Sequence, residues 1–538
     1  MNAAKRIDLL CAAAVAAIFL ALHMPGASSH AIHPDESDLL YPMLGLLRQN
    51  ADLLRHCVVI HIGSFFFPVM IHTYHGPYEG YLSLPFLVLF GNTSRAVFYR
   101  AAFFDALSTG LIYWAARALF KDRLAALLAG FLWATSGFAL ASDFGLFWGT
   151  SVIGMVMLSV VSAADWFETG RPGAFVAASA WLGLACAART WTVALPLAVL
   201  LAAIPFRREL RRPLGSLSPR RLAAAAGAFL VFFAPSLIGN ALSNWSTLRF
   251  FATPGAAPAM PFSEALATVW RGLWDLLRAQ TDRFPLIGND RVPDALLGTI
   301  VAWGFLLAAA LVLAEALRRR VAGGPLPKRH LFLLGVFAVY VLLSALSPTN
   351  KNANHLYPVL PFLYMNLAAF PLIFARVHLR RAAWALVFSF AAYSAAHNLR
   401  VIRWYQAAAR AKGGSGPESS SAILDLSAWL TREKIRNPVV ASLINVSGSL
   451  LYFGGGEIVP EDTSWGQNPA APVDRGRWIQ TVCAEDRTFI VTVDPLPERS
   501  TAPALAAIAR ACGKPFVKSR DFLSRDGRVV FAAYRTRR

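Results

Sequence analysis

The sequence predicts a polytopic α-helical membrane protein with a small C-terminal α/β domain outside the membrane. Of its 538 residues, 56% are hydrophobic and only 15% are charged, whereas about a quarter of the residues in a soluble domain are charged. Apolar runs near the length that a helix needs to cross about 30 Å of hydrocarbon recur through roughly the first 400 positions. Clusters of basic residues separate these runs, as in cytoplasmic loops of membrane proteins.

The apolar runs predict about eleven membrane-spanning helices. With the N-terminus in the cytoplasm, an odd number of spans places the C-terminus outside, and each basic cluster then lies on the cytoplasmic side. The clusters are Arg117 to Arg123, Arg207 to Arg221, Arg318 to Lys328, and Arg376 to Arg381. The expected spans are residues 7–24, 95–119, 124–141, 145–163, 173–188, 191–206, 222–240, 294–317, 331–347, 356–376 and 382–399.

The first apolar run also has features of a signal peptide, with Lys5 and Arg6 before it and Gly26-Ala27-Ser28 after it. A retained first helix is favoured because so many spans follow. The net charge of +20 is explained by the basic loops, and no aromatic–basic binding motif is found, so nucleic acid is not an expected partner. Cys483 and Cys512 could form a disulfide if the C-terminal region is outside the cytoplasm.

The first outer loop, residues 25–94, is long and half apolar. Val58 to Ile71 and Tyr81 to Phe90 are too short for a confident crossing, so both are expected as helices at the interface or half inserted. Pro34 suits the first turn of a helix, where acidic residues complement the helix dipole. Pro42 is expected to kink or restart that helix.

The chain divides into a membrane domain (1–400), a linker (401–418) and a soluble domain (419–538). Lys412 to Pro417 has the Gly/Ser/Pro composition of a linker. The alternation of patterns beyond it indicates an α/β domain with an accessory or substrate-docking role. Gly454-Gly455-Gly456 is by itself a weak signal. Helices are expected at Ser420–Lys434 and Ala502–Ala511, and strands at Pro438–Leu443, Thr488–Val493 and Arg528–Tyr534.

Two polar clusters in the first outer loop are the best candidates for chemistry. His33 to Asp38 carries Asp35, Glu36 and Asp38, and Tyr74 to Tyr81 follows. Acidic residues so close to a bilayer are costly to dehydrate, so they usually line a water-filled cavity or a reaction site. A carboxylate there can accept a proton from an acceptor hydroxyl or hold a divalent cation such as Mg²⁺ or Mn²⁺. These clusters indicate an enzyme.

The order of motifs resembles that of the GT-C glycosyltransferases. An acidic pair follows the first span, and a His/Pro/Tyr segment leads into Leu84 to Gly91. Arg95 and Arg100 open the next span, which ends Ala116 to Phe120, and Asn354 to Pro361 resembles the late outer loop of such enzymes. Within that group, the pattern is similar to the family 39 protein mannosyltransferases and the lipid A aminoarabinose transferases. The resemblance covers about residues 1–400.

The resemblance implies a polyprenyl-phosphate-linked sugar as donor and an acceptor hydroxyl on a glycan, a lipid or a protein. Transfer would occur on the outer face of the membrane with inversion at the anomeric carbon. Asp35 matches the catalytic aspartate of the first loop. The aminoarabinose transferases have a lysine where this chain has Gly76, and His75 and Glu79 are the nearby polar residues. This departure leaves the phosphate contact and the sugar undetermined.

Several residues have both a functional and a structural interpretation. Glu36 is expected as a second catalytic carboxylate or, with Asp35, a metal ligand; its alternative is a solvated acid. A departing phosphate needs donors aimed at its developing charge, and a buried arginine can alternatively snorkel to the interface. Asp143 alternatively caps a helix end. The candidates for contacts with donor phosphate or sugar are His75, Glu79, Arg100, Asp143, Arg189, Lys351 and His355.

Three other functions remain open. A transporter or flippase of lipid-linked saccharides would show repeats and interrupted helices around charges at mid-membrane. A ligase or polymerase would place its basic residues in a large late loop, without an acidic pair in the first loop. A non-catalytic assembly protein would bind a partner through the C-terminal domain. The Ala- and Arg-rich composition indicates a GC-rich bacterium, so the expected location is the plasma membrane, with the C-terminal domain in the periplasm.

Overall fold

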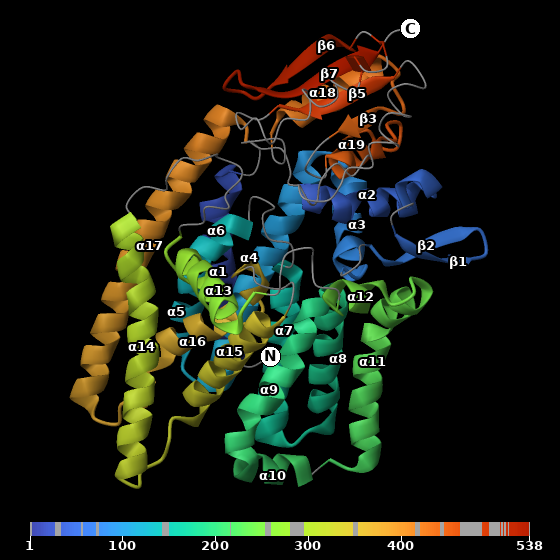
Figure 1. Ribbon diagram of the computed structural model, residues 1–538. Coiled ribbons are helices and arrows are strands. Elements are labelled where there is room, and N and C mark those ends of the chain that lie inside the picture. Colours follow the sequence, from blue (N-terminus) through green and yellow to red (C-terminus); the bar gives the residue numbers. More distant parts are fainter. Residues whose placement is uncertain are drawn as a thin grey trace.

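The computed structural model shows a helical bundle with a β-sheet domain at one end (Figure 1). The helices of the bundle extend away from the sheet, and the long helix α17 runs along one side towards it. The structure describes residues 3–26, 34–54, 57–71, 75–142, 150–215, 217–252, 260–279, 295–347, 353–414, 420–441, 446–462, 487–493, 506, 509–510, 513–514 and 516–536.

Each of the predicted spans falls on helical structure. Six helical segments among the described residues are long and apolar enough to cross a membrane, while the full set of crossings stays a prediction. The helices of the bundle are α1 (Ala3–His23), α4 (Ser94–Phe120), α5 (Arg123–Ala134), α6 (Gly137–Ser142), α7 (Thr150–Thr169), α8 (Pro172–Ala188), α9 (Ala194–Ala203), α10 (Arg207–Gly215), α11 (Pro219–Leu242), α12 (Ser246–Ala252), α13 (Phe262–Leu277), α14 (Ala295–Val321), α15 (Lys328–Leu346), α16 (Leu360–Ala369) and α17 (Val377–Lys412). Short 3₁₀ segments η1 (Met24–Gly26), η3 (Thr190–Val193), η4 (Ile204–Phe206), η5 (Ala353–Leu356) and η6 (Phe370–Ile373) adjoin them.

The basic clusters lie at the end of the bundle opposite the β-sheet domain. Figure 1 shows α10 at this end, with the α14–α15 connection and the start of α17. The turn between α4 and α5 lies at the same end. Its Lys121 is 2.5 Å from Glu168 of α7, and Glu168 also faces Arg329 at the start of α15. Large apolar side chains, among them Val231 and Trp303, remain exposed along the bundle, as lipid-facing positions require. One end is therefore basic and the other carries the soluble domain.

The first outer loop forms helices and a hairpin between α1 and α4. It contains α2 (Pro34–Arg48), η2 (Ala51–Leu54), β1 (Val58–Ile62), β2 (Phe65–Met70) and α3 (Tyr78–Phe90). Pro34 begins α2 as expected, and the helix continues through Pro42 without restarting. The apolar positions of α2 recur at helical spacing and are buried, as Leu40, Met43 and Leu44 show.

The expectation of a helix over Val58 to Ile71 is wrong, because this segment is the antiparallel hairpin β1–β2. Its register pairs Ile62 with Phe65, so the turn is Gly63-Ser64, and Gly63 has φ 61°. Two-residue hairpin turns need such a backbone, which glycine adopts without steric cost. The β-branched and aromatic residues on both sides of Gly63 were the signal for this hairpin. Tyr81 to Phe90 is helical, within α3.

The C-terminal domain has the expected α/β character. It contains α18 (Ala422–Arg432), β3 (Val439–Ala441), α19 (Ser447–Phe453), β4 (Glu461–Asp462), β5 (Thr488–Thr492), β6 (Phe516–Leu523) and β7 (Val529–Thr536). The sheet order is β4-β3-β5-β7-β6. Strand β3 pairs in parallel with β4 and β5, and β7 pairs antiparallel with β5 and β6. The three predicted strands are confirmed; the predicted helix at Ala502–Ala511 and both Cys483 and Cys512 lie mostly or wholly outside the described residues.

Helix α17 continues to Lys412, into the range expected as a linker (401–418). Its apolar residues keep helical spacing beyond position 400, and Val401, Tyr405 and Ala409 are fully buried. Burial of this stripe explains why the helix continues beyond position 400. The helix stops at Gly413, which has φ 67°, as is common for a residue that ends a helix.

Separate apolar clusters lie in the bundle and in the C-terminal domain, and a third connects them. The cluster of the C-terminal domain includes Leu450, Ile490 and Phe531. The connecting cluster contains residues of α2, α3, α4 and α19, including Leu451 and Tyr452. The C-terminal domain is thus packed onto the first outer loop through buried apolar contacts.

Candidate active site

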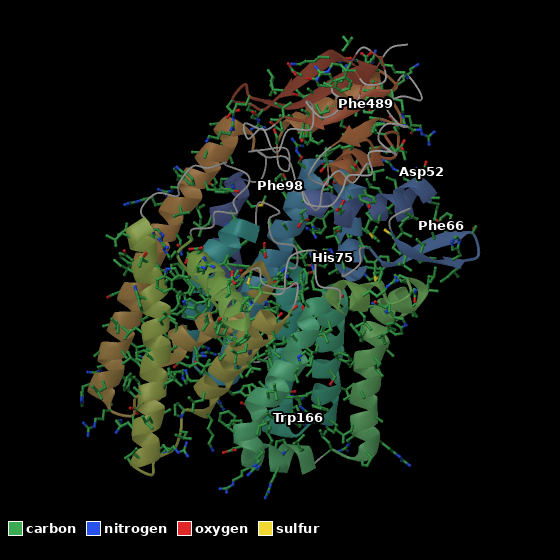
Figure 2. The ribbon with its side chains drawn as sticks, in the orientation of Figure 1. Asp52, Phe66, His75, Phe98, Trp166 and Phe489 are labelled. Atoms are coloured by element: carbon green, nitrogen blue, oxygen red, sulfur yellow. The ribbon has the colours of Figure 1, made fainter. Side chains whose placement is uncertain are left out.

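The residues that meet in the candidate site come from four segments that are distant in sequence. Glu36 lies in the first turn of α2, and Arg100 is on α4. His75 precedes α3, Glu79 lies in its first turn, and Arg189 follows the last residue of α8. In Figure 2, His75 lies between Phe489 of the C-terminal domain and Trp166 at the basic end of the bundle. All five side chains are buried.

Arg189 is the centre of this site. Its Nε lies 2.8 Å from Oε2 of Glu79, and the two side chains are 1% and 2% exposed. Its Nη1 lies 2.7 Å from Nε2 of His75, so the guanidinium faces an imidazole nitrogen that accepts. The backbones of His75 and Arg189 also form an isolated antiparallel bridge. Arg189 is therefore fixed by both its main chain and its side chain.

Glu79 has a second partner, Ser151 on α7, whose hydroxyl donates to Oε1 at 2.9 Å. The Ser83 hydroxyl donates to the Glu79 carbonyl oxygen within α3 at 2.7 Å. Oε1 of this buried carboxylate accepts a hydrogen bond and Oε2 faces the guanidinium at ion-pair distance, which together restrain its orientation. Glu79 thus orients Arg189, and Ser151 orients Glu79.

Glu36 and Arg100 form a second buried ion pair. Burial raises the pKa of Glu36, Arg100 opposes this shift, Glu79 adds to it, and Arg189 lowers it. The two ion pairs are therefore close enough to act on each other. Each arginine faces one glutamate, which leaves no net charge from these four side chains when all are ionised.

Trp191 of η3 connects this site to His355. Its ring lies edge-on to His355, with centroids 3.6 Å apart, and edge-on to His75 at 6.1 Å. The Tyr340 hydroxyl donates to the carbonyl oxygen of His355 at 3.2 Å. His355, which belongs to the late outer segment, is thereby placed beside the segment that carries Arg189.

Gly76, the position where the aminoarabinose transferases have a lysine, has no room for a side chain. A Cβ there would lie 1.8 Å from the carbonyl oxygen of Ala187 in α8. The backbone before α3 therefore packs directly onto the end of α8, and this close approach brings His75 to Arg189. The absence of the lysine has a steric reason in this chain.

The structure brings together five predicted site residues, His75, Glu79, Arg189, Glu36 and Arg100, and places His355 beside them. The side chain of Asp35 and the whole of Asp143 and Lys351 lie outside the described residues. Ser151, Trp191 and Tyr340 were not foreseen. The sequence did contain a signal for Trp191, because this residue lies two positions after Arg189, which interrupts an apolar stretch. It contained no comparable signal for Ser151 or Tyr340.

A cation site on Asp35 and Glu36 stays a prediction. Oxygen ligands of this kind suit Mg²⁺ or Mn²⁺. In the part of the chain that the structure describes, no group of three or more His, Cys, Asp or Glu side chains is placed to hold a metal. Glu36 already faces Arg100, so a cation there would compete with a guanidinium.

Residues 74–238 match the family model of the dolichyl-phosphate-mannose-protein mannosyltransferases. This segment contains four of the five residues that meet in the candidate site: His75, Glu79, Arg100 and Arg189. No curated protein matches the chain in sequence.

Solved structures of an archaeal oligosaccharyltransferase share its fold. The oligosaccharyltransferase of Archaeoglobus fulgidus in its apo form has a TM-score of 0.51 at 14% identity, over 96% of this chain and 69% of that one. The complex of the archaeal oligosaccharyltransferase AglB from the same organism, with an inhibitory peptide and a dolichol-phosphate, gives 0.51 and 14% over 97% and 70%. ArnT from Cupriavidus metallidurans bound to undecaprenyl phosphate gives 0.47 and 15% over 99% and 98%. The chain has the fold of these archaeal oligosaccharyltransferase structures, in agreement with the resemblance of its sequence motifs to the GT-C glycosyltransferases, and its residues 74–238 match the family model of the dolichyl-phosphate-mannose-protein mannosyltransferases.

Proposed function

We propose that this protein transfers a sugar from a polyprenyl-phosphate-linked donor to an acceptor hydroxyl on the outer face of the membrane. The observation that carries the proposal is the buried cluster of His75, Glu79 and Arg189, next to the Glu36–Arg100 pair. The cluster lies in the segment that matches a family of lipid-linked sugar transferases. A dolichol-phosphate is bound by AglB, a protein of the same fold, which supports a lipid phosphate as the donor's leaving group.

The reaction needs a base and a positive charge. In our proposal, the Asp35 carboxylate accepts the proton of the acceptor hydroxyl, whose oxygen attacks the anomeric carbon from the face opposite the phosphate. The bond from that carbon to the phosphate oxygen breaks, and the polyprenyl phosphate leaves as an anion. One displacement inverts the anomeric configuration.

Arg189 is our candidate to stabilise the departing phosphate. A buried guanidinium acts through a lower effective dielectric than an exposed one, so its charge is weakly screened. Because His75 and Glu79 hold it in place, little reorganisation is needed when negative charge develops. Arg100, Lys351, His355 and Asp143 remain candidates for further donor contacts, and Arg100 also fixes Glu36.

The location follows from the same proposal. The site lies at the end of the bundle that carries the C-terminal domain, opposite the basic clusters (Figures 1 and 2). If the basic end faces the cytoplasm, as the charge rule predicts, the N-terminus is cytoplasmic, and the site and the soluble domain are periplasmic. We place the protein in the plasma membrane of a bacterium.

The test is a transfer assay with purified protein and a panel of radiolabelled polyprenyl-phosphate monosaccharides, comparing wild type with Asp35→Asn. Loss of label from the lipid with wild type alone supports the proposal and identifies the donor. Turnover that Asp35→Asn leaves unchanged contradicts the role of Asp35. Parallel reactions with Mg²⁺ and with a chelator decide whether Asp35 and Glu36 also hold a cation. Movement of intact lipid-linked sugar across vesicles, without cleavage, would favour a flippase.

A further inference from the structure

The short helix α19 of the C-terminal domain contacts both helices that supply the Glu36–Arg100 pair. Towards α2, the hydroxyl of Ser449 lies 2.9 Å from that of Ser37, the residue after Glu36. Towards α4, the Tyr452 hydroxyl donates to the carbonyl oxygen of Thr93, the residue that precedes the helix, at 2.9 Å. Figure 1 shows α19 between the sheet and α2.

Apolar packing reinforces these polar contacts. Leu451 and Tyr452 are fully buried in one cluster with Leu39 of α2 and Val97 of α4. Leu450, on another face of the same helix, belongs to the core of the C-terminal domain. Since α19 is part of both cores, a displacement of the domain would expose apolar surface on each side.

The end of α19 is bound by the outer loop as well. The helix ends at the glycine turn Gly454–Gly456, where the Arg48 guanidinium of α2 donates to the carbonyl oxygen of Gly455. The side-chain amide of Asn92, just before α4, donates to the carbonyl oxygens of Tyr452 and Phe453 at 3.1 and 2.9 Å. The last carbonyls of a helix have no intrahelical partner, and donors from elsewhere satisfy them here. The three-glycine motif thus has a structural use.

Gly448 shows how closely α19 approaches α2. A Cβ at this position would lie 1.9 Å from Oδ1 of Asp38. The Asp38 carboxylate therefore occupies the space that a side chain at position 448 would need. Asp38 lies in the same part of α2 as Asp35 and Glu36, so a side chain at position 448 would have to displace a carboxylate within this acidic segment.

We propose that α19 and its glycine turn (Ser447–Gly456) hold α2 against α4 and thereby position the acidic pair for catalysis. The C-terminal domain would then be required for turnover through its contacts with α2, without touching the reacting atoms. This inference rests on the proposed sugar transfer for its catalytic meaning, whereas the mechanical link between α19 and α2 can be measured without any substrate.

The test compares Gly448→Ala with Gly227→Ala. Gly227 lies inside α11, and a Cβ there has nothing within 4 Å, so it controls for the change from glycine to alanine in a helix. We expect faster amide hydrogen exchange over residues 34–48 in Gly448→Ala. We also expect its kcat to fall by about tenfold or more, because small misplacements of reacting groups cost this much. The KM for the donor should change less than the kcat. Gly227→Ala should match wild type in both measurements.

Two further variants separate positioning from misfolding. Tyr452→Phe removes only the hydroxyl that binds the Thr93 carbonyl oxygen, and should give a smaller change of the same kind. Asp38→Ala/Gly448→Ala makes room for the new methyl group, so exchange over 34–48 should return towards that of Asp38→Ala alone. Exchange of β5 and β7 reports whether the C-terminal domain stays folded.

Unchanged exchange over residues 34–48 in Gly448→Ala would overturn the inference. Faster exchange with an undiminished kcat would overturn the positioning role. If wild type transfers sugar from no donor of the panel, the proposed function fails, and the exchange comparison alone decides whether α19 holds α2.

Discussion

Arg189 and Glu79 form an ion pair of 2.8 Å in which both side chains are almost completely buried. One residue follows a bundle helix and the other begins a helix of the first outer loop. The pair therefore joins the loop that carries the acidic cluster to the membrane domain. Burying two charges is costly unless each is compensated, so this pair has to be complete to be tolerated.

Glu79→Ala should lower the free energy of unfolding by about 3–5 kcal/mol, because it leaves the Arg189 charge buried and uncompensated. Ser151→Ala, which removes only the hydroxyl that donates to Glu79, should cost about 1 kcal/mol. Chemical or thermal unfolding in detergent measures both. Equal losses in the two variants would contradict the view that Glu79 compensates Arg189.

Arg189→Lys should lower kcat/KM for sugar transfer by at least about 10²-fold, a loss typical of removing one donor to a developing charge. Lysine keeps the positive charge but cannot face both Glu79 and His75 with a planar guanidinium. Arg171→Lys is the matched control, since Arg171 lies on the surface and pairs with Asp165. If both variants kept full activity, Arg189 would have only a structural role.

Gly76→Ala should destabilise the protein, because its methyl group would meet the backbone of α8 at Ala187. A backbone carbonyl cannot move as the end of a flexible side chain can, so we expect a loss of about 1–3 kcal/mol. Gly173→Ala, at a position with open space, is the control and should be close to neutral. A stable Gly76→Lys variant would show that the contact with α8 is dispensable.

The stability of the wild type relative to Glu36→Gln should fall as the pH rises. Burial raises the pKa of Glu36 above its ordinary value of 4.5, against the effect of Arg100. The protonated carboxyl group is therefore more favoured in the folded state than in the unfolded state. Its contribution to stability is complete below pH 4.5 and is lost as the pH rises through the raised pKa. Unfolding of both proteins between about pH 4 and 7.5 measures the difference; a constant difference would argue against the raised pKa.

The sequence was sufficient to predict that the expected spans are helical, because long apolar runs have few other conformations in a membrane, but α12 and α13 fell outside those spans. It was also sufficient to select Glu36, His75, Glu79, Arg100 and Arg189, which meet in the structure, but not Ser151 or Tyr340. An arginine such as Arg189 within an apolar stretch is costly unless it has a partner. Which partner it has could not be read from the sequence, because His75 and Glu79 reach Arg189 through the packing of α3 onto α8.

The hairpin β1–β2 and the role of α19 were missed for different reasons. The hairpin had a local signal at Gly63, but the apolar content of the segment favoured an interfacial helix. The contacts of α19 with α2 join residues about 400 positions apart, as Ser37 and Ser449 show, and no local pattern encodes such a pairing. Gly454-Gly455-Gly456 was visible as a motif, but its partner Arg48 was not.

Substitutions of Trp191 can distinguish a packing role from a chemical role of His355, because the Trp191 ring contacts His355 and also approaches His75. Trp191→Phe keeps an aromatic ring and should retain most of the transfer activity. Trp191→Ala leaves a cavity between the two histidines and should cost about 3–5 kcal/mol of stability. If His355 contributes to donor binding, Trp191→Ala should also raise the KM for the donor, measured in protein that is still folded at the assay temperature. His355→Ala should then raise the KM for the donor without the large loss of stability. A KM that neither variant changes would show that His355 only packs against Trp191 and would remove it from the donor site.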